Sequence, residues 1–147
     1  MGAPLVSENR PTKITAADVA PNRRRGGDLR VLLGPKTVGT TTGFMGRLSL
    51  EPAEFVSEHY HPYSEEFLYV VRGEVLVRVD GEPVVLEPGA ALFVPIGVRH
   101  RVENVGVGPA EVVFTLGPLA PRPELGHVDT EELPAPDEQG LDVGGRT

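Results

Sequence analysis

The segment EHYHPYSEEF, residues 58 to 67, concentrates side chains that bind metal ions more densely than any other part of the chain. His59 and His61 are separated by one residue, and Glu65 and Glu66 follow. Side chains alternate between the two faces of a β-strand, so a strand here would point both imidazoles to the same side. Glu65 and Glu66 would point in opposite directions, and alternation alone does not decide which one joins the histidines.

A third imidazole comes from the stretch GAALFVPIGVRHRVEN, in which a turn at Pro95-x-Gly97 precedes His100 at the start of a predicted strand. Three imidazoles and one carboxylate suit Fe(II), Mn(II), Co(II), Ni(II) or Zn(II), and this mixed donor set does not select among them. We expect one divalent transition metal, with Zn(II) favoured. His127, the remaining histidine, is an alternative fourth ligand, although it lies on a tail outside both stretches.

The elements that must position these residues are short strands. The chain contains 18 glycines and 15 prolines, and they separate about eight short apolar runs such as EFLYVV and AEVVFTL. This pattern is typical of an all-β fold. Asp80-Gly81, between two alternating runs, predicts a two-residue hairpin turn. We therefore expect one antiparallel sandwich or barrel over residues 29–117, preceded by an arm (1–28) and followed by a Pro-, Gly- and acid-rich tail (118–147) that is disordered at its end.

Composition excludes several other classes of protein. Cysteine is absent, so disulfides, thiolate metal sites and cysteine nucleophiles are excluded. The formal charge of −7 opposes binding to nucleic acid. There is no run of about 18 apolar residues and no secretory signal pattern at the start, so we expect a soluble, cytoplasmic protein that does not insert into membranes.

These residues resemble the two sequence motifs of the cupins. The first motif, His-x-His, three or four residues, Glu, six residues, Gly, is matched by His59, His61, Glu66 and Gly73. The second motif, separated from Gly73 by fifteen residues, is matched by Gly89, Pro95, Gly97, His100 and Asn104. The resemblance implies the jelly-roll barrel of that family and makes Glu66, rather than Glu65, the expected ligand. We expect the three glycines to serve turns that need positive φ or close approach, and Asn104 to make hydrogen bonds at a strand end.

A narrower resemblance covers about residues 28 to 132. The stretches RVLLGPKTVGTTTGFMG, EHYHPYSEEFLYVVRGE, ALFVPIGVRHRVEN and LGPLAPRPELGHVDTE are similar to the small monocupin cyclases of bacterial aromatic polyketide clusters, of the tetracenomycin, resistomycin and spore-pigment type. That resemblance implies a partner of a type II polyketide synthase. Such an enzyme folds a poly-β-ketone intermediate, bound to an acyl carrier protein, into a specific ring.

A Lewis-acidic metal fits an intramolecular aldol cyclisation, because it can stabilise an enolate oxygen or polarise the accepting carbonyl. Metal-bound water is the expected base, and Tyr63 is a weak candidate for a proton donor, while Tyr60 should face away from the metal. Apolar side chains would form the wall of the substrate pocket and exclude water. The expected wall residues are Phe44, Met45, Leu68, Val70, Phe93 and Phe114.

Two features of the chain suggest partners. Arg23, Arg24, Arg25 and Arg30 form a basic cluster in an acidic protein, and the hypothesis is that they steer an acidic carrier protein to the pocket. A solvated loop is the simpler interpretation of this cluster. The apolar run EVVFTL would supply a surface for a homodimer.

Two alternative functions remain open. A cupin with bound Fe(II) or Mn(II) could act as an oxygenase on a polyketide or phenolic intermediate, in which case oxygen would be consumed. A non-catalytic cupin could bind a metabolite or assist the synthase, in which case its effect would survive replacement of His61 and Glu66 by alanine. The fold alone does not choose among these functions.

Overall fold

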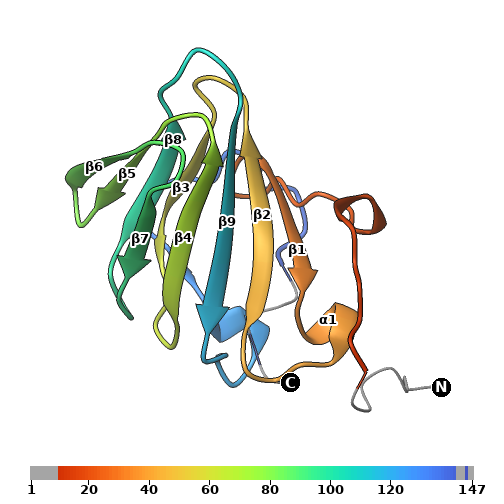
Figure 1. The fold of residues 1–147 in the computed structure, drawn as a ribbon. Helices are drawn as coiled ribbons and strands as arrows, with labels where there is room; N and C mark the ends of the chain where they lie inside the picture. The colour runs from red at the N-terminus through yellow and green to blue at the C-terminus, as the bar shows by residue number, and fades with distance from the viewer. Residues whose placement is uncertain (1–9, 142–144, 146–147) are drawn as a thin grey trace.

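A computed structural model describes residues 10–141 and residue 145, and these residues form two five-stranded antiparallel sheets that face each other (Figure 1). The first sheet, in front in Figure 1, has the spatial order β1 (Asp28–Leu33), β2 (Phe44–Leu50), β9 (Ala110–Gly117), β4 (Glu65–Arg72) and β7 (Ala91–Val94). The second has the order β10 (Val128–Asp129), β3 (Phe55–Tyr60), β8 (His100–Asn104), β5 (Val75–Val79) and β6 (Glu82–Leu86). The all-β prediction is confirmed.

Few residues of the described chain are helical. One short helix, α1 (Pro35–Val38), and two 3-10 turns, η2 (Ala16–Asp18) and η3 (Pro123–Leu125), lie outside the sheets. None of the helices described is long and apolar enough to cross a membrane. The structure has two more strands than the eight runs counted in the sequence, because β3 carries polar residues among apolar ones and β10 is only two residues long.

The core lies between the two sheets and follows from the alternation of side chains along the strands. In β9, Val112, Phe114 and Leu116 are buried, whereas the residues between them are half-exposed. Val75 and Val77 of β5 approach the same core from the opposite sheet. The run EVVFTL is therefore a central strand with one face in the core, rather than an exposed apolar surface.

The predicted hairpin turn is present between β5 and β6. Val79 pairs with Glu82, so Asp80 and Gly81 form a two-residue loop, with φ values of 51° and 85°. Positive φ at both central residues is typical of the turns that match the twist of the flanking strands. This turn fixes the register of the hairpin at the far edge of the second sheet.

A β-bulge in β3 sets the direction of the first histidine. Val56 pairs with Val102, but His59 pairs with His100, so three steps along β3 match two along β8. The extra residue switches the alternation, so Val56 and His59 are both buried although their positions differ by three, an odd number. Without the bulge, a strand that buries Val56 would turn His59 away from the core.

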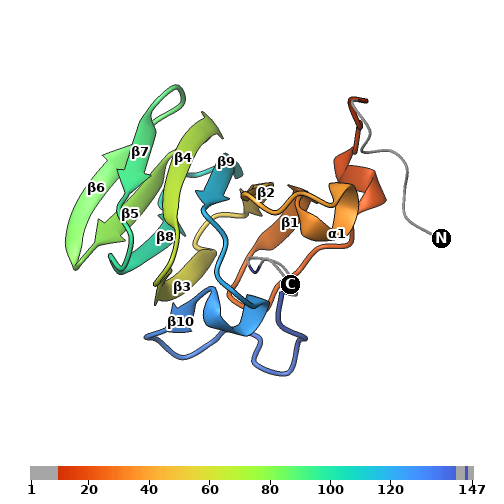
Figure 2. The same ribbon diagram turned by 90° about the horizontal axis from the view of Figure 1, so that it is seen from below.

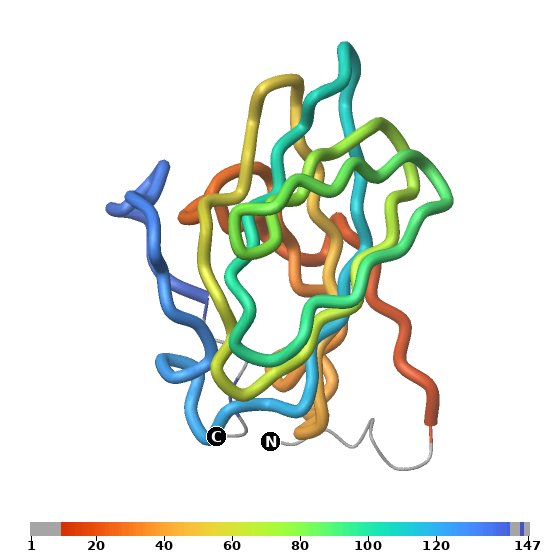
Figure 3. The backbone as a smooth tube through the Cα atoms, turned by 90° about the vertical axis from the view of Figure 1, so that its left-hand side faces the viewer, coloured from red at the N-terminus to blue at the C-terminus, as the bar shows by residue number. Residues whose placement is uncertain are grey.

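The C-terminal segment closes one side of the barrel. Strand β10 pairs with β3, with Val128 opposite Tyr60 and Asp129 opposite His59. Figure 2 shows β10 and η3 beside the lower end of the barrel, and Figure 3 shows the same blue segment running past the edge of the second sheet. The predicted disorder at the end of the tail concerns residues that lie mostly outside those described.

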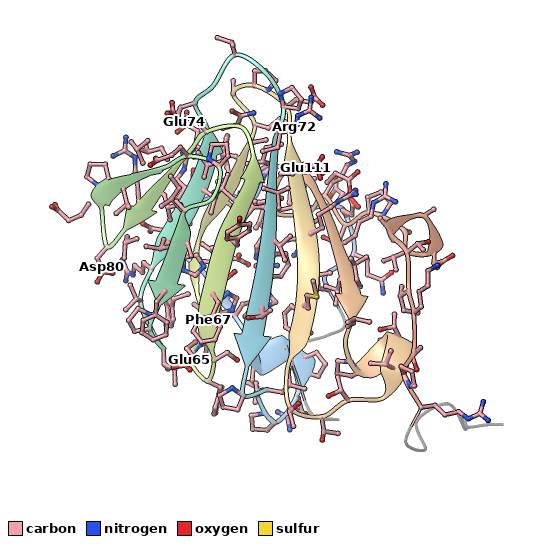
Figure 4. All side chains as sticks on the ribbon, in the orientation of Figure 1. Glu65, Phe67, Arg72, Glu74, Asp80 and Glu111 are labelled. Atoms are coloured by element: carbon pink, nitrogen blue, oxygen red, sulfur yellow. The ribbon has the colours of Figure 1, made fainter. Side chains whose placement is uncertain are left out.

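The outer face of the first sheet carries exposed aromatic side chains. Phe67 and Phe93 are cross-strand neighbours whose ring centroids lie 5.7 Å apart, and each is about half exposed. Figure 4 shows Phe67 on this face, with Glu65 towards one end of β4 and Arg72 at the other. We name Phe67, Tyr69, Val71 and Phe93 the aromatic patch.

The arginines of the N-terminal arm contact the body of the protein. Arg24 donates hydrogen bonds to the carbonyl oxygens of Pro136 and Glu138. Arg30 binds Asp28 through Nε, at 2.9 Å, and Arg25 is buried against Asp129. Arg23 is the most exposed of the four and lies 3.7 Å from Asp28. Arg24, Arg25 and Arg30 therefore bind partners within the chain, and Arg23 remains the most exposed cation of the cluster. Docking of a carrier protein to this cluster stays a prediction.

Candidate metal centre

Three histidines from two neighbouring strands and the adjoining loop converge between the sheets. His59 ends β3, His61 follows that strand and His100 begins β8, where it is the cross-strand partner of His59. Their ring nitrogens lie within 4.8 Å of one another. His59 and His100 are buried, and His61 is nearly so. Separations of this size match ligands arranged around one ion.

Each of the three imidazoles is held by a backbone carbonyl at its other nitrogen. The Nδ1 atom of His59 lies 2.8 Å from the oxygen of Ser57, that of His61 lies 3.0 Å from the oxygen of Gly126, and that of His100 lies 3.0 Å from the oxygen of Val98. A carbonyl only accepts, so Nδ1 donates in each pair and Nε2 keeps its lone pair. Such contacts orient metal-binding histidines in proteins.

Glu66 supplies the carboxylate from the opposite sheet. Its Oε1 atom lies 2.9 Å from Nε2 of His100 and 3.4 Å from Nε2 of His61. Nevertheless, Oε1 of Glu66 and Nε2 of His100 are both fully buried without a hydrogen bond of acceptable geometry within the described residues. Buried polar atoms are rarely left so. The four residues therefore fit a metal ion, which would satisfy both atoms at once. The side chain of Glu65, by contrast, lies on the opposite face of β4 and is partly exposed.

The protonation of the site is set by burial and by the proximity of the four groups. Burial, followed by the charges of His100 and His61, lowers the pKa of His59 well below its usual value. Burial would also lower the pKa of His100, but the carboxylate of Glu66 outweighs it, and this pKa is raised. Burial alone would raise the pKa of Glu66, yet His100 and His61 together lower it. A metal ion at Nε2 of His100 would compete with a proton for that atom, so metal binding would be weaker at low pH.

The centre lies in the wall of a largely apolar cavity between the sheets. About 70 Å³ of the cavity is accessible to the centre of a water-sized molecule, and the cavity opens to solvent. Phe44, Leu68 and Phe114 line it, as the sequence predicted. The wall also includes residues that the sequence analysis did not assign to it, namely Arg25, Leu29, Leu48, Val56, Ser64, Val102, Leu116, Gly126 and Leu141.

Three of the predicted wall residues do not line the cavity, which corrects that prediction. Phe93 belongs to the aromatic patch on the outer face. Met45 pairs with Thr115, on the face opposite to the buried Phe114. Val70 is fully buried in the core but does not line the cavity. These assignments rested on hydrophobicity, whereas the direction of a side chain follows from strand register.

Tyr60 and Tyr63 lie away from the candidate centre. Tyr60 alternates with His59 and is partly exposed opposite Val128. Tyr63 is 44% exposed and does not line the cavity, so its candidacy as a proton donor is not supported by its position.

His127 lines the same cavity but lies outside the cluster of converging histidines. It makes no hydrogen bond within residues 10–141. Burial, and then the charge of Arg25, lower the pKa of His127 to about 4. Its position therefore fits a neutral group in the cavity wall, while Glu66, which contacts His100 and His61, fits the fourth position of the candidate site.

The remaining residues of the motifs have structural roles. Gly73, Gly89 and Gly97 all have positive φ. At Gly73 a Cβ atom would also come within 2.6 Å of the carbonyl oxygen of Pro109, so a side chain is excluded twice. Asn104 donates to the carbonyl oxygens of Leu50 and Gly108 and accepts from the backbone of Gly106, joining three segments at the end of β8.

Two antiparallel sheets with three histidines and one glutamate between them are the arrangement of a cupin. A family model described as the cupin domain matches residues 46–116, which include all four of these residues. The chain belongs to the cupin family.

Within that family the chain is similar over most of its length to proteins of Streptomyces. It is 56% identical over 133 residues to "Tetracenomycin polyketide synthase protein TcmJ" of Streptomyces glaucescens, covering 90% of this chain and 89% of the relative. It is 57% identical over 122 residues to "Polyketide synthase CurC" of Streptomyces cyaneus, covering 83% of this chain and 79% of the relative.

Solved structures support the fold. An oxalate oxidase in complex with the substrate analogue glycolate superimposes with a TM-score of 0.68 over 87% of this chain and 68% of that chain. The two sequences are 22% identical, so the likeness concerns the fold alone.

Proposed function

We propose that this protein is a metal-dependent aromatic polyketide cyclase, which promotes the intramolecular aldol cyclisation and aromatisation of a carrier-bound poly-β-ketone. The observation that carries the proposal is the position of the metal centre, with its buried, unpaired Glu66 and His100 atoms, in the wall of an apolar cavity. The similarity to polyketide synthase proteins over nine-tenths of the chain supports the substrate class.

The metal, when bound, would supply positive charge that stabilises a developing enolate oxygen or polarises a carbonyl. His59, His61 and His100 would hold it through Nε2, because the backbone carbonyls occupy Nδ1. Glu66 would contribute the single negative charge, which leaves a divalent site with a net positive charge facing the substrate. We propose Zn(II) as the resident ion, with Fe(II), Mn(II), Co(II) and Ni(II) as the other ions suited to this donor set.

The apolar wall would contribute by folding the chain. Phe44 and Phe114 meet edge to face, with centroids 6.2 Å apart, and form a rigid surface in the cavity. A surface of this kind restricts a flexible poly-β-ketone to folded conformations, which lowers the entropic cost of bringing two of its carbons together. It also limits access of water to a reactive intermediate.

A comparison of variants tests the proposal. Purified protein would be incubated with a carrier-bound poly-β-ketone under strict anaerobiosis, and the products separated by mass and retention time. We expect the wild type to direct most of the material into one ring system. His61→Ala should give the mixture obtained without protein, whereas Tyr63→Phe, outside the cavity, should behave as the wild type.

The same reaction separates the two alternatives. An oxygenase would leave the substrate unchanged without O2 and would consume O2 when it is admitted. A metabolite-binding or synthase-assisting cupin would give the same product pattern with His61→Ala as with the wild type. Either result would contradict the cyclase proposal.

A further inference from the structure

Next to the candidate metal centre, two further polar residues, Asp129 and Arg25, lie at the β10 edge of the second sheet. His100, His59 and Asp129 are consecutive cross-strand partners on β8, β3 and β10. Directly opposed residues of antiparallel strands share one face of a sheet, with Cβ atoms about 4.5–5.5 Å apart. Asp129 therefore lies beside His59, one of the proposed metal ligands.

The side chain of Arg25 is held in place by hydrogen bonds to Asp129. Its Nε and Nη2 atoms donate to the two carboxylate oxygens of Asp129, at 2.7 Å and 3.2 Å. The backbone oxygen of Arg25 also accepts a hydrogen bond of 2.9 Å from the amide of Ser57, two residues before His59. The side chain is thus fixed at both ends, and a bidentate pair of this kind fixes the plane of the guanidinium.

The guanidinium retains hydrogen-bonding capacity that the protein does not use. Arg25 is only 7% exposed and lines the cavity. No residue among those described accepts a hydrogen bond from its Nη1 atom. An arginine stays charged at all physiological pH values, so Nη1 is a cationic donor at the cavity wall. This atom is not among the fully buried side-chain atoms that lack a partner, so solvent reaches it, and a ligand oxygen would replace that solvent.

The surroundings of Arg25 favour an oxygen atom of a ligand. His127 also lines the cavity, and burial together with the charge of Arg25 lowers its pKa, so it adds no second positive charge to the wall. The rest of the lining is mostly apolar and suits a flat carbon skeleton.

We propose that Arg25 is a second substrate-binding residue, whose Nη1 atom donates a hydrogen bond to a carbonyl, enolate or phenolate oxygen of a ligand that places another oxygen at the metal centre. The ligand class is a flat molecule with at least two oxygen functions on one carbon skeleton. Its identity as a polyketide rests on the function proposed above, whereas the subsite itself rests on the geometry of Arg25.

A matched pair of probes isolates this hydrogen bond. 2-Naphthol has one oxygen, and dihydroxynaphthalenes have the same rings with two. The chain contains no tryptophan, so binding of both to Zn(II)-loaded protein can be followed by naphthol fluorescence. We expect at least one diol to bind the wild type roughly 10-fold or more tightly than 2-naphthol, as for a hydrogen bond to a charged group. In Arg25→Gln this ratio should fall to near 1.

Arg24→Gln is the control, because Arg24 anchors the same C-terminal segment through Pro136 and Glu138 but does not line the cavity. Its ratio should equal that of the wild type. The proposal is overturned if no diol binds the wild type more tightly than 2-naphthol, or if Arg25→Gln weakens both probes equally, which is the result of a purely structural role.

A second measurement serves if Arg25→Gln does not fold. The side-chain N–H resonances of Arg25 in the wild type should shift on addition of the selected diol and stay in place with 2-naphthol; no shift with either probe would overturn the proposal. Neither experiment depends on ring closure. If the cyclisation assay fails but Arg25→Gln lowers the affinity ratio of diol to 2-naphthol to near 1, the proposed function is rejected and the subsite is kept. If cyclisation succeeds but the ratio is the same in Arg25→Gln and the wild type, only the subsite is rejected.

Discussion

Oε1 of Glu66 and Nε2 of His100 lie 2.9 Å apart across the two sheets, yet neither atom makes a hydrogen bond of acceptable geometry within the described residues. The two side chains approach from different sheets, since Glu66 belongs to β4 and His100 to β8. The Nε2 atom of His61 lies 3.4 Å from the same oxygen, and the possible ligand atoms of His59, His61 and His100 lie within 4.8 Å of one another. A divalent ion bound among these four residues would satisfy both atoms.

The first prediction concerns the choice of carboxylate. Glu66→Gln removes the negative charge of the site with little change of volume, so we expect metal affinity to fall by more than the roughly 10–100-fold that loss of an outer-shell partner costs. Glu65→Gln, at the adjacent and half-exposed position, should leave affinity unchanged. Competition with a chromogenic chelator measures both. Equal affinities of Glu66→Gln and the wild type would remove Glu66 from the site.

The second prediction concerns pH. The folded protein lowers the pKa of His127 to about 4, below its value of 6.5 in the unfolded chain, so the unfolded state binds more protons between these values. The contribution of His127 to stability is present above about pH 6.5 and is lost as the pH falls towards 4. Between pH 7 and 5 the wild type should lose about 1–2 kcal/mol more unfolding free energy than His127→Gln.

Urea unfolding of the metal-free wild type and of His127→Gln at both pH values measures this difference. Equal losses in the two proteins would show that His127 is not buried as a neutral group.

The third prediction separates the cavity wall from the outer face. Phe114 is 6% exposed and packs in the core and cavity, so Phe114→Ala should lower the unfolding free energy by about 3–5 kcal/mol and weaken binding of 2-naphthol. Phe93 is 51% exposed, and Phe93→Ala should cost about 1 kcal/mol or less without effect on binding. Chemical denaturation and naphthol titration give both quantities. If Phe93→Ala weakened binding of 2-naphthol more than Phe114→Ala does, Phe93 rather than Phe114 would belong to the cavity wall.

The fourth prediction concerns a homodimer, which stays a prediction from the sequence. The aromatic patch supplies a surface for it, in place of the run in β9. Glu65 and Arg72 lie towards opposite ends of β4, so a two-fold axis near Tyr69 would bring the acidic end of one copy to the basic end of the other (Figure 4). We expect a mass of twice 15.7 kDa by light scattering.

Phe67→Lys should give the mass of one chain. Val85→Lys is the control, because Val85 is equally exposed but lies on β6 of the other sheet, and it should remain a dimer. A wild type that elutes as one chain, or a dimer that survives Phe67→Lys, would exclude this surface.

The sequence was sufficient to predict the fold class and the convergence of His59, His61 and His100, because both depend on local spacing. The glycines at positions 73, 89 and 97 and the Asp80-Gly81 turn require positive φ, which few other residues adopt. The choice between Glu65 and Glu66 needed the family resemblance, since alternation alone gives two equivalent answers. The bulge beside Ser57 has no sequence signal that alternation would reveal.

Long-range contacts explain what the sequence analysis missed. Arg25 looked like part of a basic surface cluster because nothing near it in the sequence indicates that Asp129, 104 residues away, would bind it. Phe93 looked like a wall residue because its neighbours are apolar, but pairing with Phe67 turns it to the outside. In both cases strand pairing, rather than composition, determines where the side chain lies.

The central claim is that ring closure depends on the metal held by His59, His61, Glu66 and His100. The most direct measurement is product analysis of an anaerobic reaction with a carrier-bound poly-β-ketone, using protein stripped by chelator and the same protein reloaded with Zn(II). The account predicts that the stripped protein gives the mixture formed without protein and that reloading restores a single ring system. Equal product patterns from stripped and reloaded protein would contradict it.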